Sequence, residues 1–208
     1  MATKISAYIA RTLLIFICLC LYTHSDLKSQ DNYNWKLKKE GKDVKVYTGS
    51  MEDENIKRYK GTAVIHTNAD RLLKFLLDYD NYSDWIEDCE VSKTLFKNEN
   101  VITYYALYKT PWPFQNREFV TDVHVTNSSD KIVITSIKSE HKYDSDVNAF
   151  RVENYEEVFT IETIDENSVN LLQIAFYDPG GNIPAWLINM FLVDAPYNSL
   201  TKMKELLE

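Results

Sequence analysis

Apolar and polar residues alternate along two short segments of the chain, residues 44–48 and 57–66. In the second segment Tyr59, Gly61 and Ala63 share one side, and the residues between them share the other. A period of two residues is typical of a β-strand with two different faces. These segments therefore predict two strands near the beginning of the folded region.

Helical patterns lie on either side of these strands. Residues 31–40 place a few apolar residues among polar ones and favour a short helix that ends at Gly41. Residues 68–78 predict a longer helix with Asn68 as its N-cap, because the Asn side chain accepts a hydrogen bond from the first turn. The apolar positions that recur along one face of this helix are Leu72, Leu73, Phe75, Leu76 and Leu77.

Most of the chain from residue 90 to residue 176 has the pattern of strands. Short polar breaks at residues 98–100, 127–130 and 165–167 suit hairpin turns. Strands joined in this way form an antiparallel meander, one side of which is expected to be apolar. The predicted strands are residues 90–95, 101–110, 118–126, 131–139, 151–163 and 168–176.

The last predicted element is a helix over residues 183–207, capped near Asn182. Pro184 suits its first turn, whereas Pro196 should kink or break it. Around residues 186–193 the helix is apolar on nearly every side, which indicates burial on more than one side, or contact with a ligand or a membrane. We expect this helix to cover the apolar side of the sheet.

The first 29 residues differ in kind from the rest. Lys4 and Arg11 precede an apolar run over residues 13–21, and mostly polar residues follow, which is the layout of a signal peptide. The run is about half of the ~20 residues that span a bilayer, so we expect cleavage. The protein is then exported, to a bacterial periplasm or out of the cell, and residues 31–208 form one domain.

Composition narrows the classes of partner. The formal net charge is −8 and the sequence has no cluster of basic residues, so nucleic acid is not expected to bind. The same acidity disfavours broad adhesion to anionic membranes and leaves room only for transient membrane contact. After cleavage Cys89 is the single remaining cysteine, so no intramolecular disulfide is expected. We expect a monomer.

Motifs for catalysis are missing from the sequence. It contains no His-Glu-x-x-His, no paired cysteines beyond the export segment, no Gly-rich phosphate loop and no Gly-x-Ser-x-Gly. Glu156 and Glu157 are neighbours on a predicted strand and point to opposite faces, and we attribute both to solvation. We expect no enzyme, no catalytic residue, no cofactor and no metal ion.

Two motifs connect the chain to a known family. Residues 111–114 (Pro-Trp-Pro-Phe) lead into residues 116–120 (Asn-Arg-Glu-Phe-Val), and residues 177–181 (Tyr-Asp-Pro-Gly-Gly) lead into residues 183–187 (Ile-Pro-Ala-Trp-Leu). With the order of the predicted elements, these motifs resemble the START-domain branch of the Bet v 1-like helix-grip superfamily. The resemblance covers nearly all of residues 31–208.

The resemblance implies an α+β helix-grip fold, in which a curved antiparallel sheet wraps around the C-terminal helix and encloses a hydrophobic cavity. It also implies that the cavity binds, and transfers, one lipid or sterol-like molecule. A lipid tail gains roughly 0.8 kcal/mol for each buried CH₂, so such a cavity needs few polar contacts. The candidate wall residues are Tyr105, Leu107, Phe119, Thr121, Val123, Ile134, Phe159, Leu171, Gln173, Trp186, Leu187, Met190 and Phe191.

Arg117 is the most informative polar position, because the alternation of its strand aims it, with Phe119, toward the apolar face. It either orients the head group of a ligand or forms a structural ion pair with a carboxylate such as Asp178. Gly180 and Gly181 are the candidate hinge for opening the C-terminal helix as a gate.

Two other classes of function remain open. A helix-grip enzyme of the cyclase or hydrolase type would act on a hydrophobic substrate in the same cavity, with Arg117, a tyrosine and a carboxylate. A module that binds a protein partner would have a filled core and an exposed apolar patch on its last helix. Uptake of an unchanged ligand distinguishes a carrier from both.

Overall fold

The structure, a computed structural model, describes residues 33–50 and 55–208. The chain divides into two compact units, Met1–Asn34 and Trp35–Glu208, and all elements described below belong to the second. The predicted signal peptide, residues 1–29, lies outside the described residues. Within the described ranges, no helix is long and apolar enough to cross a membrane.

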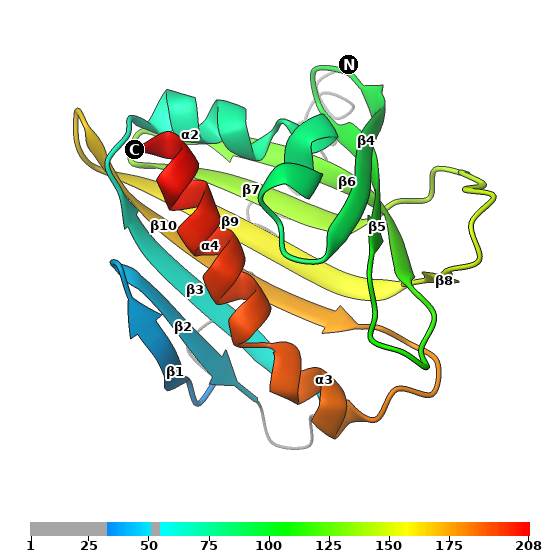
Figure 1. Ribbon diagram of the computed structural model, residues 1–208. Helices are drawn as coiled ribbons and strands as arrows, with labels where there is room; N and C mark the ends of the chain where they lie inside the picture. Colours follow the sequence, from blue (N-terminus) through cyan, green and yellow to red (C-terminus); the bar gives the residue numbers. More distant parts are fainter. Residues whose placement is uncertain (1–32, 51–54) are drawn as a thin grey trace, which may run out of the picture. The chain divides into compact units, whose positions relative to one another are not determined.

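A ten-stranded sheet forms the body of the second unit, in the order β1-β2-β3-β10-β9-β7-β6-β5-β4 (Figure 1). Neighbours along this path are antiparallel, and β8 pairs in parallel with β6 beside it. The predicted meander is confirmed, and the pairing of β10 with β3 joins it to the first strands. The strands are β1 (Lys36–Gly41), β2 (Val44–Gly49), β3 (Arg58–Ile65), β4 (Cys89–Lys97), β5 (Ile102–Tyr108), β6 (Arg117–Asn127), β7 (Lys131–Lys138), β8 (Phe150–Arg151), β9 (Asn154–Asp165) and β10 (Ser168–Asp178).

The predicted opening helix is wrong, because the described part of that segment forms strand β1. Lys42 and Asp43 have φ angles of 51° and 58°, and two successive left-handed residues make a tight hairpin turn. Gly41 pairs with Val44 across this turn. The segment is too short for its helical pattern to be informative. Hydrogen bonding to β2 therefore decides its conformation.

The predicted helix at residues 68–78 is confirmed as α2 (Ala69–Leu76). The Asn68 side chain caps it by accepting a hydrogen bond from the backbone N–H of Arg71 at 2.9 Å. The polar turn that follows is a 3₁₀ helix, η2 (Tyr79–Asp84), which packs against β4. Together these elements form one end of the layer over the sheet.

The last predicted helix is two helices, α3 (Ala185–Phe191) and α4 (Asp194–Leu207). Pro196 lies in the first turn of α4, where its missing N–H has no intrahelical acceptor to lose. In a continuous helix its ring would clash with the carbonyl of Leu192 one turn earlier. The predicted break near Pro196 is thus confirmed, and it separates two helices with different surroundings.

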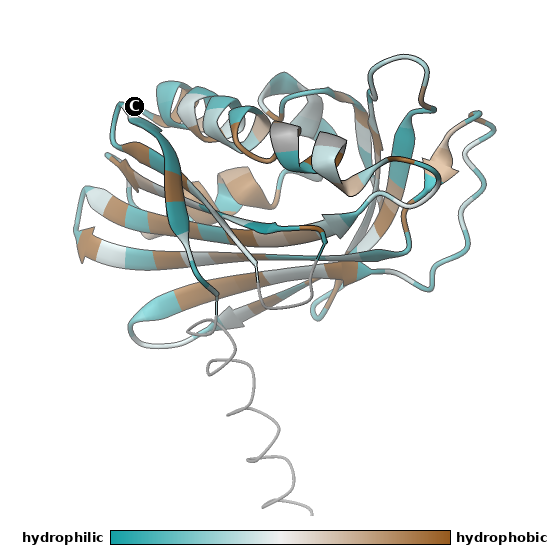
Figure 2. Cartoon of the chain, turned by 90° about the horizontal axis from the view of Figure 1, so that it is seen from below, coloured by the Kyte–Doolittle hydropathy of each residue, from teal (hydrophilic) through white to brown (hydrophobic). Residues whose placement is uncertain are grey.

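The helices lie over one face of the curved sheet, as Figures 1 and 2 show. α4 packs across β2 and β3, and α2 packs against β9. The main hydrophobic core fills the space beneath α4, with Leu200, Met203 and Leu207 from the helix fully or almost fully buried. This is the expected α+β helix-grip fold.

Candidate ligand-binding cavity

A cavity of about 330 Å³ lies between the sheet and the last two helices. This volume is at the lower end of the roughly 300–1,000 Å³ that is usual for small-molecule sites. The lining comes from strands β3, β5, β6, β7, β9 and β10, the turn after η2, the β5–β6 loop, and α3 and α4. It consists of Tyr59, Trp85, Ile86, Glu87, Asp88, Tyr104, Tyr108, Lys109, Thr110, Pro111, Phe114, Arg117, Phe119, Thr121, Ser136, Tyr155, Glu157, Gln173, Tyr177, Pro179, Ile183, Ile188, Phe191, Leu192, Ala195, Pro196 and Ser199.

Aromatic rings make up much of the cavity wall. Phe119 lies edge-on to three tyrosine rings, with centroid distances of 5.3 Å to Tyr108, 4.9 Å to Tyr155 and 5.9 Å to Tyr177. Tyr177 also stacks on Tyr59 at 6.3 Å. Such offset and edge-to-face contacts fix the rings in place, so this part of the cavity is preformed.

A carboxyl group is buried within this aromatic wall. Glu157 of β9 is 8% exposed, and its Oε1 accepts hydrogen bonds from Gln173 Nε2 at 2.6 Å and from the Tyr59 hydroxyl at 3.4 Å. Gln173 Nε2 also donates to the Tyr59 hydroxyl at 2.8 Å. The three side chains come from the adjacent strands β3, β10 and β9 and form one polar cluster on an otherwise apolar wall.

Burial controls the protonation of this cluster. Desolvation raises the pKa of Glu157 above its usual value of 4.5, although hydrogen bonds from Gln173, Tyr177 and Tyr59 partly oppose the rise. Desolvation and the neighbouring carboxyl group also raise the pKa values of Tyr59 and Tyr177 well above 10. Below pH 10 the tyrosines therefore stay neutral, and Glu157 is the group of the cluster that titrates.

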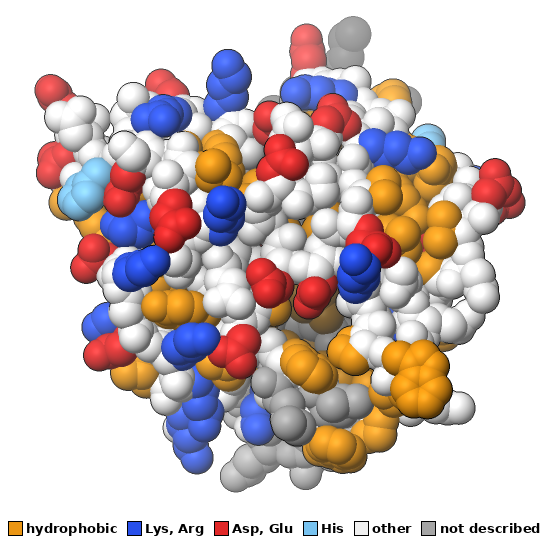
Figure 3. All heavy atoms as spheres, viewed as in Figure 1, with side chains coloured by type: hydrophobic (Ala, Val, Ile, Leu, Met, Phe, Trp, Pro, Cys, Tyr) orange, Lys and Arg blue, Asp and Glu red, His pale blue; other side chains and the backbone are white. Residues whose placement is uncertain are grey.

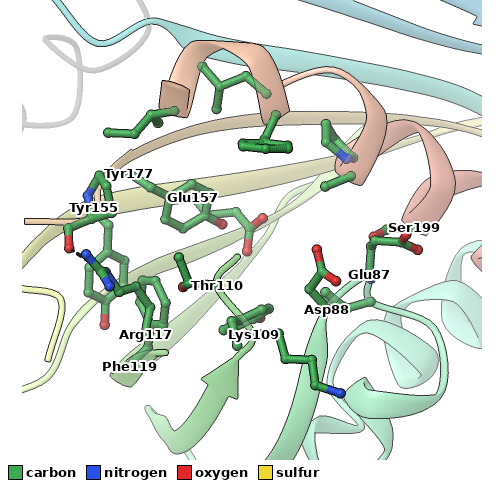
Figure 4. A pocket seen from close by; sticks show the side chains of 18 of the residues that line it. Glu87, Asp88, Lys109, Thr110, Arg117, Phe119, Tyr155, Glu157, Tyr177 and Ser199 are labelled. Atoms are coloured by element: carbon green, nitrogen blue, oxygen red, sulfur yellow. Dashed lines mark hydrogen bonds between the residues drawn. The ribbon is translucent and has the colours of Figure 1, made fainter. Parts of the chain in front are cut away.

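Figure 4 shows Glu157 directed into the pocket between two groups of polar and charged side chains. At one end Arg117 lies beside Phe119 and Tyr155, and at the other end Glu87 and Asp88 lie near Ser199. Charged side chains of the lining thus lie on both sides of Glu157, and Lys109 lies between the two groups.

Arg117 is held by backbone carbonyl groups. Its Nε donates to the carbonyl of Pro179 at 3.0 Å, its Nη2 to that of Gly180 at 3.2 Å, and its Nη1 to that of Gln115. Of the two expected roles, the ion pair with Asp178 is not formed. The guanidinium group lines the cavity and binds the loop that leads into α3.

Exposed aromatic residues lie on two of the segments that line the cavity, the β5–β6 loop and α3. Trp112 of the β5–β6 loop is 92% exposed, and Trp186 and Phe191 of α3 are 65% and 49% exposed. Neighbours of these residues, Pro111 and Ile188, line the cavity itself. Figure 3 shows hydrophobic side chains gathered over α3 and the β5–β6 loop on this face.

The structure brings some of the predicted wall residues together. Arg117, Phe119, Thr121, Gln173 and Phe191 line the cavity. Four others lie in the main hydrophobic core instead, farther along their strands and beneath the helices: Val123, Ile134, Phe159 and Leu171. They share the inward face with the lining residues, but α2 and α4 cover them.

The prediction that Tyr105 and Leu107 line the cavity is wrong, because they lie on the opposite face of β5. They pack with Val120 on the other side of the sheet, against the segment that contains Tyr143 and Ala149. Every residue of β5 except the last is buried, so its pattern distinguishes no face. The pairing of β5 with β6 distinguishes the two faces. Tyr104, Ala106 and Tyr108 lie opposite Thr121, Phe119 and Arg117 and share their face.

The remaining predicted residues belong to the last loop and α3. Trp186 is exposed and does not line the cavity. The side chains of Leu187 and Met190 lie outside what the structure describes. Gly180 and Gly181 lie in the loop bound by Arg117, with φ angles of 60° and 68° that glycine adopts readily.

The assignment of Glu157 to solvent was wrong. Glu156 is exposed, but Glu157 points inward with Tyr155 and Phe159, as strand alternation requires. A second polar residue on the neighbouring strand, Gln173, was the signal for a buried pair. Cys89 is buried, and burial raises its pKa to about 11, so its thiol stays protonated at neutral pH.

Within residues 33–50 and 55–208, no group of three or more His, Cys, Asp or Glu side chains is arranged to hold a metal ion. The cavity lining offers hydrogen-bonding groups, aromatic rings and apolar surface.

Comparison with protein families gives one assignment for most of the chain. The model of the START domain matches residues 20–206. An uncharacterized protein of Pseudomonas aeruginosa is 29% identical over 177 residues, which cover 84% of this chain and 87% of that protein. The mouse phosphatidylcholine transfer protein is 24% identical over 176 residues, 82% of each chain.

Solved structures show the same fold. A STAR-related lipid transfer protein fragment from Xanthomonas axonopodis aligns with a TM-score of 0.76 at 24% identity and covers 83% of this chain and 98% of that one. Human STARD10 aligns with a TM-score of 0.73 at 19% identity and covers 82% of this chain and 71% of that one. The fold is therefore shared at low sequence identity.

Proposed function

This chain belongs to the START domain family, and from that premise we propose that it binds one lipid-like molecule in its cavity and transfers that molecule between membranes. The mouse relative and the Xanthomonas axonopodis protein are named as lipid-transfer proteins. The observation that carries the proposal is the aromatic cavity between the sheet and α3, which offers apolar surface with polar groups in the middle of its wall and at its ends.

Energetics favour an apolar ligand in this cavity. Each CH₂ group transferred from water to the cavity contributes roughly 0.8 kcal/mol, so a chain of ten such groups would supply about 8 kcal/mol before the cost of association. The ring faces of Phe119, Tyr155 and Tyr177 provide the contact surface. The small volume suits a single chain or a compact ring system unless α3 moves outward.

Contact with a membrane is the second part of the proposal. Trp112 and Trp186 are large aromatic residues left in water on the two sides of the cavity opening. Tryptophan is well suited to the membrane interface, because its ring is apolar and its N–H remains able to bond to water or head groups. We propose that these residues place the opening of the cavity against a lipid surface.

We propose α3 as the gate, rather than the whole C-terminal segment. The C-terminal end of α4 is fastened to the sheet, since Lys204 Nζ donates to the carbonyl of Val64 at 2.8 Å and binds Glu208 at 2.7 Å. α3 lies between Gly180–Gly181 and the break before Asp194, two places where the backbone direction changes. Movement of α3 alone uncovers the cavity.

Export is proposed from the sequence of residues 1–29, and the protein would then act in a periplasm or outside the cell. A carrier in such a compartment has to shield lipid from water between two membranes. The cavity is compatible with that role.

The test begins with native mass spectrometry of the protein purified from its own cells, followed by denaturing extraction of anything bound. A lipid released at about one per protein supports the proposal and identifies the ligand. Transfer of that lipid between donor and acceptor vesicles then tests the second step.

Other results would overturn the proposal. A protein that stays free of ligand after exposure to a total lipid extract does not act as a lipid carrier. A change in the mass of the bound molecule during incubation supports the helix-grip enzyme instead. Alanine at both Gly180 and Gly181 should slow exchange more than it lowers equilibrium affinity, and unchanged exchange contradicts the gate.

A further inference from the structure

The cluster of Tyr59, Glu157 and Gln173 is the unusual feature of the cavity, because a carboxyl group lies in an apolar wall without a cation. None of the ion pairs found among the described residues includes Glu157. Arg117, the guanidinium group of the lining, is occupied by three backbone carbonyls. A buried carboxylate without a cation is costly, which is why burial raises the pKa of Glu157 and favours its protonated form unless a cation or a hydrogen-bond donor lies beside it.

Hydrogen bonding in the cluster is incomplete in the same sense. Gln173 Nε2 donates to Glu157 and to Tyr59, whereas Gln173 Oε1 is fully enclosed and has no partner among the described residues. A buried acceptor without a donor costs about 1–3 kcal/mol. Rotation of the amide does not remove the problem, since it would turn the oxygen toward Glu157 and leave the N–H groups unbonded. The cluster therefore lacks one donor, and because Gln173 Oε1 is enclosed, a ligand in the cavity meets the cluster through Glu157.

The surrounding aromatic rings determine which charge the donor group of a ligand can carry. Tyr59, Tyr155 and Tyr177 present aromatic surface beside the carboxyl group, and the face of an aromatic ring carries negative potential. The ring faces repel an anion, and so does Glu157 when it is ionised. A phosphate or carboxylate head group is therefore disfavoured at this position, whereas a protonated amine or a neutral hydroxyl is favoured.

We propose that the Tyr59–Glu157–Gln173 cluster receives the polar end of the ligand and selects an amphiphile that donates hydrogen bonds there, through an N–H or O–H group, against one with an anionic head. This inference rests on the proposed function and adds the class of ligand to it. A protonated amine forms an ion pair with the carboxylate, and a hydroxyl donates a hydrogen bond to it.

The experiment compares four amphiphiles with the same twelve-carbon tail: dodecylamine, dodecanol, dodecanoic acid and dodecyltrimethylammonium. Affinities of the ligand-free protein are measured below the critical micelle concentrations at pH 7.5 by competition with a fluorescent fatty probe. We expect the better of the amine and the alcohol to bind at least about tenfold more tightly than the acid and the trimethylammonium ion.

Variants then distinguish the two possible sources of the donor. Glu157→Gln keeps the shape of the side chain, and Glu156→Gln is the matched control on the outer face of the same strand. If the ligand is an amine, Glu157→Gln weakens amine binding by tenfold or more and leaves the alcohol unchanged. If the ligand is an alcohol, the wild-type protein binds dodecanol more tightly than dodecylamine. Both variants then bind dodecanol as tightly as the wild type does.

Three results would overturn the inference. Equal binding of all four amphiphiles means that the cavity is unselective, although the proposed carrier function stands. Trimethylammonium binding as tight as that of the amine means that charge and ring faces, not hydrogen-bond donation, decide. Preference for the acid means that an anion is accommodated. The proposed function itself fails separately, when neither these amphiphiles nor a cellular lipid binds.

Discussion

Gly61 of β3 lies directly beneath Leu200 of α4: a Cβ atom built at position 61 would come within 2.5 Å of the Leu200 Cδ1 atom. Leu200 is almost fully buried in the main core, so its side chain has little room to move. The glycine thus sets how closely α4 approaches the sheet.

Gly61→Ala is expected to destabilise the protein by about 1–3 kcal/mol, the usual cost of overpacking a core. In a Leu200→Ala background, which itself costs about 2–5 kcal/mol, the same change should cost much less because the clashing atom is gone. Urea unfolding of the four proteins of this cycle measures the coupling. Equal costs of Gly61→Ala in both backgrounds would show that the contact does not limit the approach of α4.

Glu157 gives a prediction about pH and stability. Its pKa in the folded state is raised above 4.5 by burial, so the folded state holds the proton more tightly than the unfolded state does. The stabilising contribution of this proton is fully present below pH 4.5 and is lost as the pH rises through the folded-state pKa. The melting temperature of Glu157→Gln, relative to that of the wild type, should therefore increase from pH 4.5 upward.

Glu156→Gln is the control for this measurement, because Glu156 is exposed on the same strand. Its melting temperature should follow that of the wild type at every pH. The tyrosines around Glu157 remain neutral over the range, and Arg117 remains charged, so they contribute no slope. A difference between Glu157→Gln and the wild type that stays constant from pH 4.5 to 8 would contradict a raised pKa.

The fold was predictable because apolar and polar residues alternate along most strands and the turns between the strands are polar. β6 shows this, since Phe119, Thr121 and Val123 fall on the inward face that the pattern assigns to them. β1 was not predictable, because its conformation depends on left-handed φ angles at Lys42 and Asp43 that lysine rarely adopts. The pairing partner, rather than the residues of β1, decides its structure.

The cavity was harder to predict than the fold. β5 is buried on both faces, so only its register with β6 shows that Tyr104 and Tyr108 face inward while Tyr105 does not. An isolated carboxyl group is usually solvated, and the burial of Glu157 becomes evident only when Tyr59 and Gln173 come together from two other strands. Long-range register is the information that local patterns lack.

The loop before α3 allows a comparison of two adjacent glycines. Gly180 and Gly181 both have positive φ, so alanine costs about 1–2 kcal/mol at either position. At position 180 a Cβ atom would also lie 2.4 Å from the Phe150 ring, whereas at position 181 its nearest contact is Arg117 Nη2 at 3.5 Å. Gly180→Ala should therefore be the more destabilising of the two.

Chemical unfolding of both variants, with and without Phe150→Ala, checks this explanation. Removal of the ring should reduce the cost of Gly180→Ala to about that of Gly181→Ala. If Gly180→Ala stays more costly without the ring, backbone strain rather than the contact with Phe150 explains the difference.

Trp112→Ala tests membrane contact without disturbing the cavity. The side chain is 92% exposed, so the variant should unfold within about 0.5 kcal/mol of the wild type and bind soluble amphiphiles with unchanged affinity. Its rate of lipid transfer between zwitterionic vesicles should fall at least severalfold, since the residue acts only when the opening meets a lipid surface.

Phe96→Ala is the control, because Phe96 is 46% exposed near the far end of β4, roughly 20 Å along the strand from the cavity opening. Transfer that slows equally in both variants would indicate a general loss of surface hydrophobicity, and unchanged transfer in Trp112→Ala would remove this loop from the docking surface.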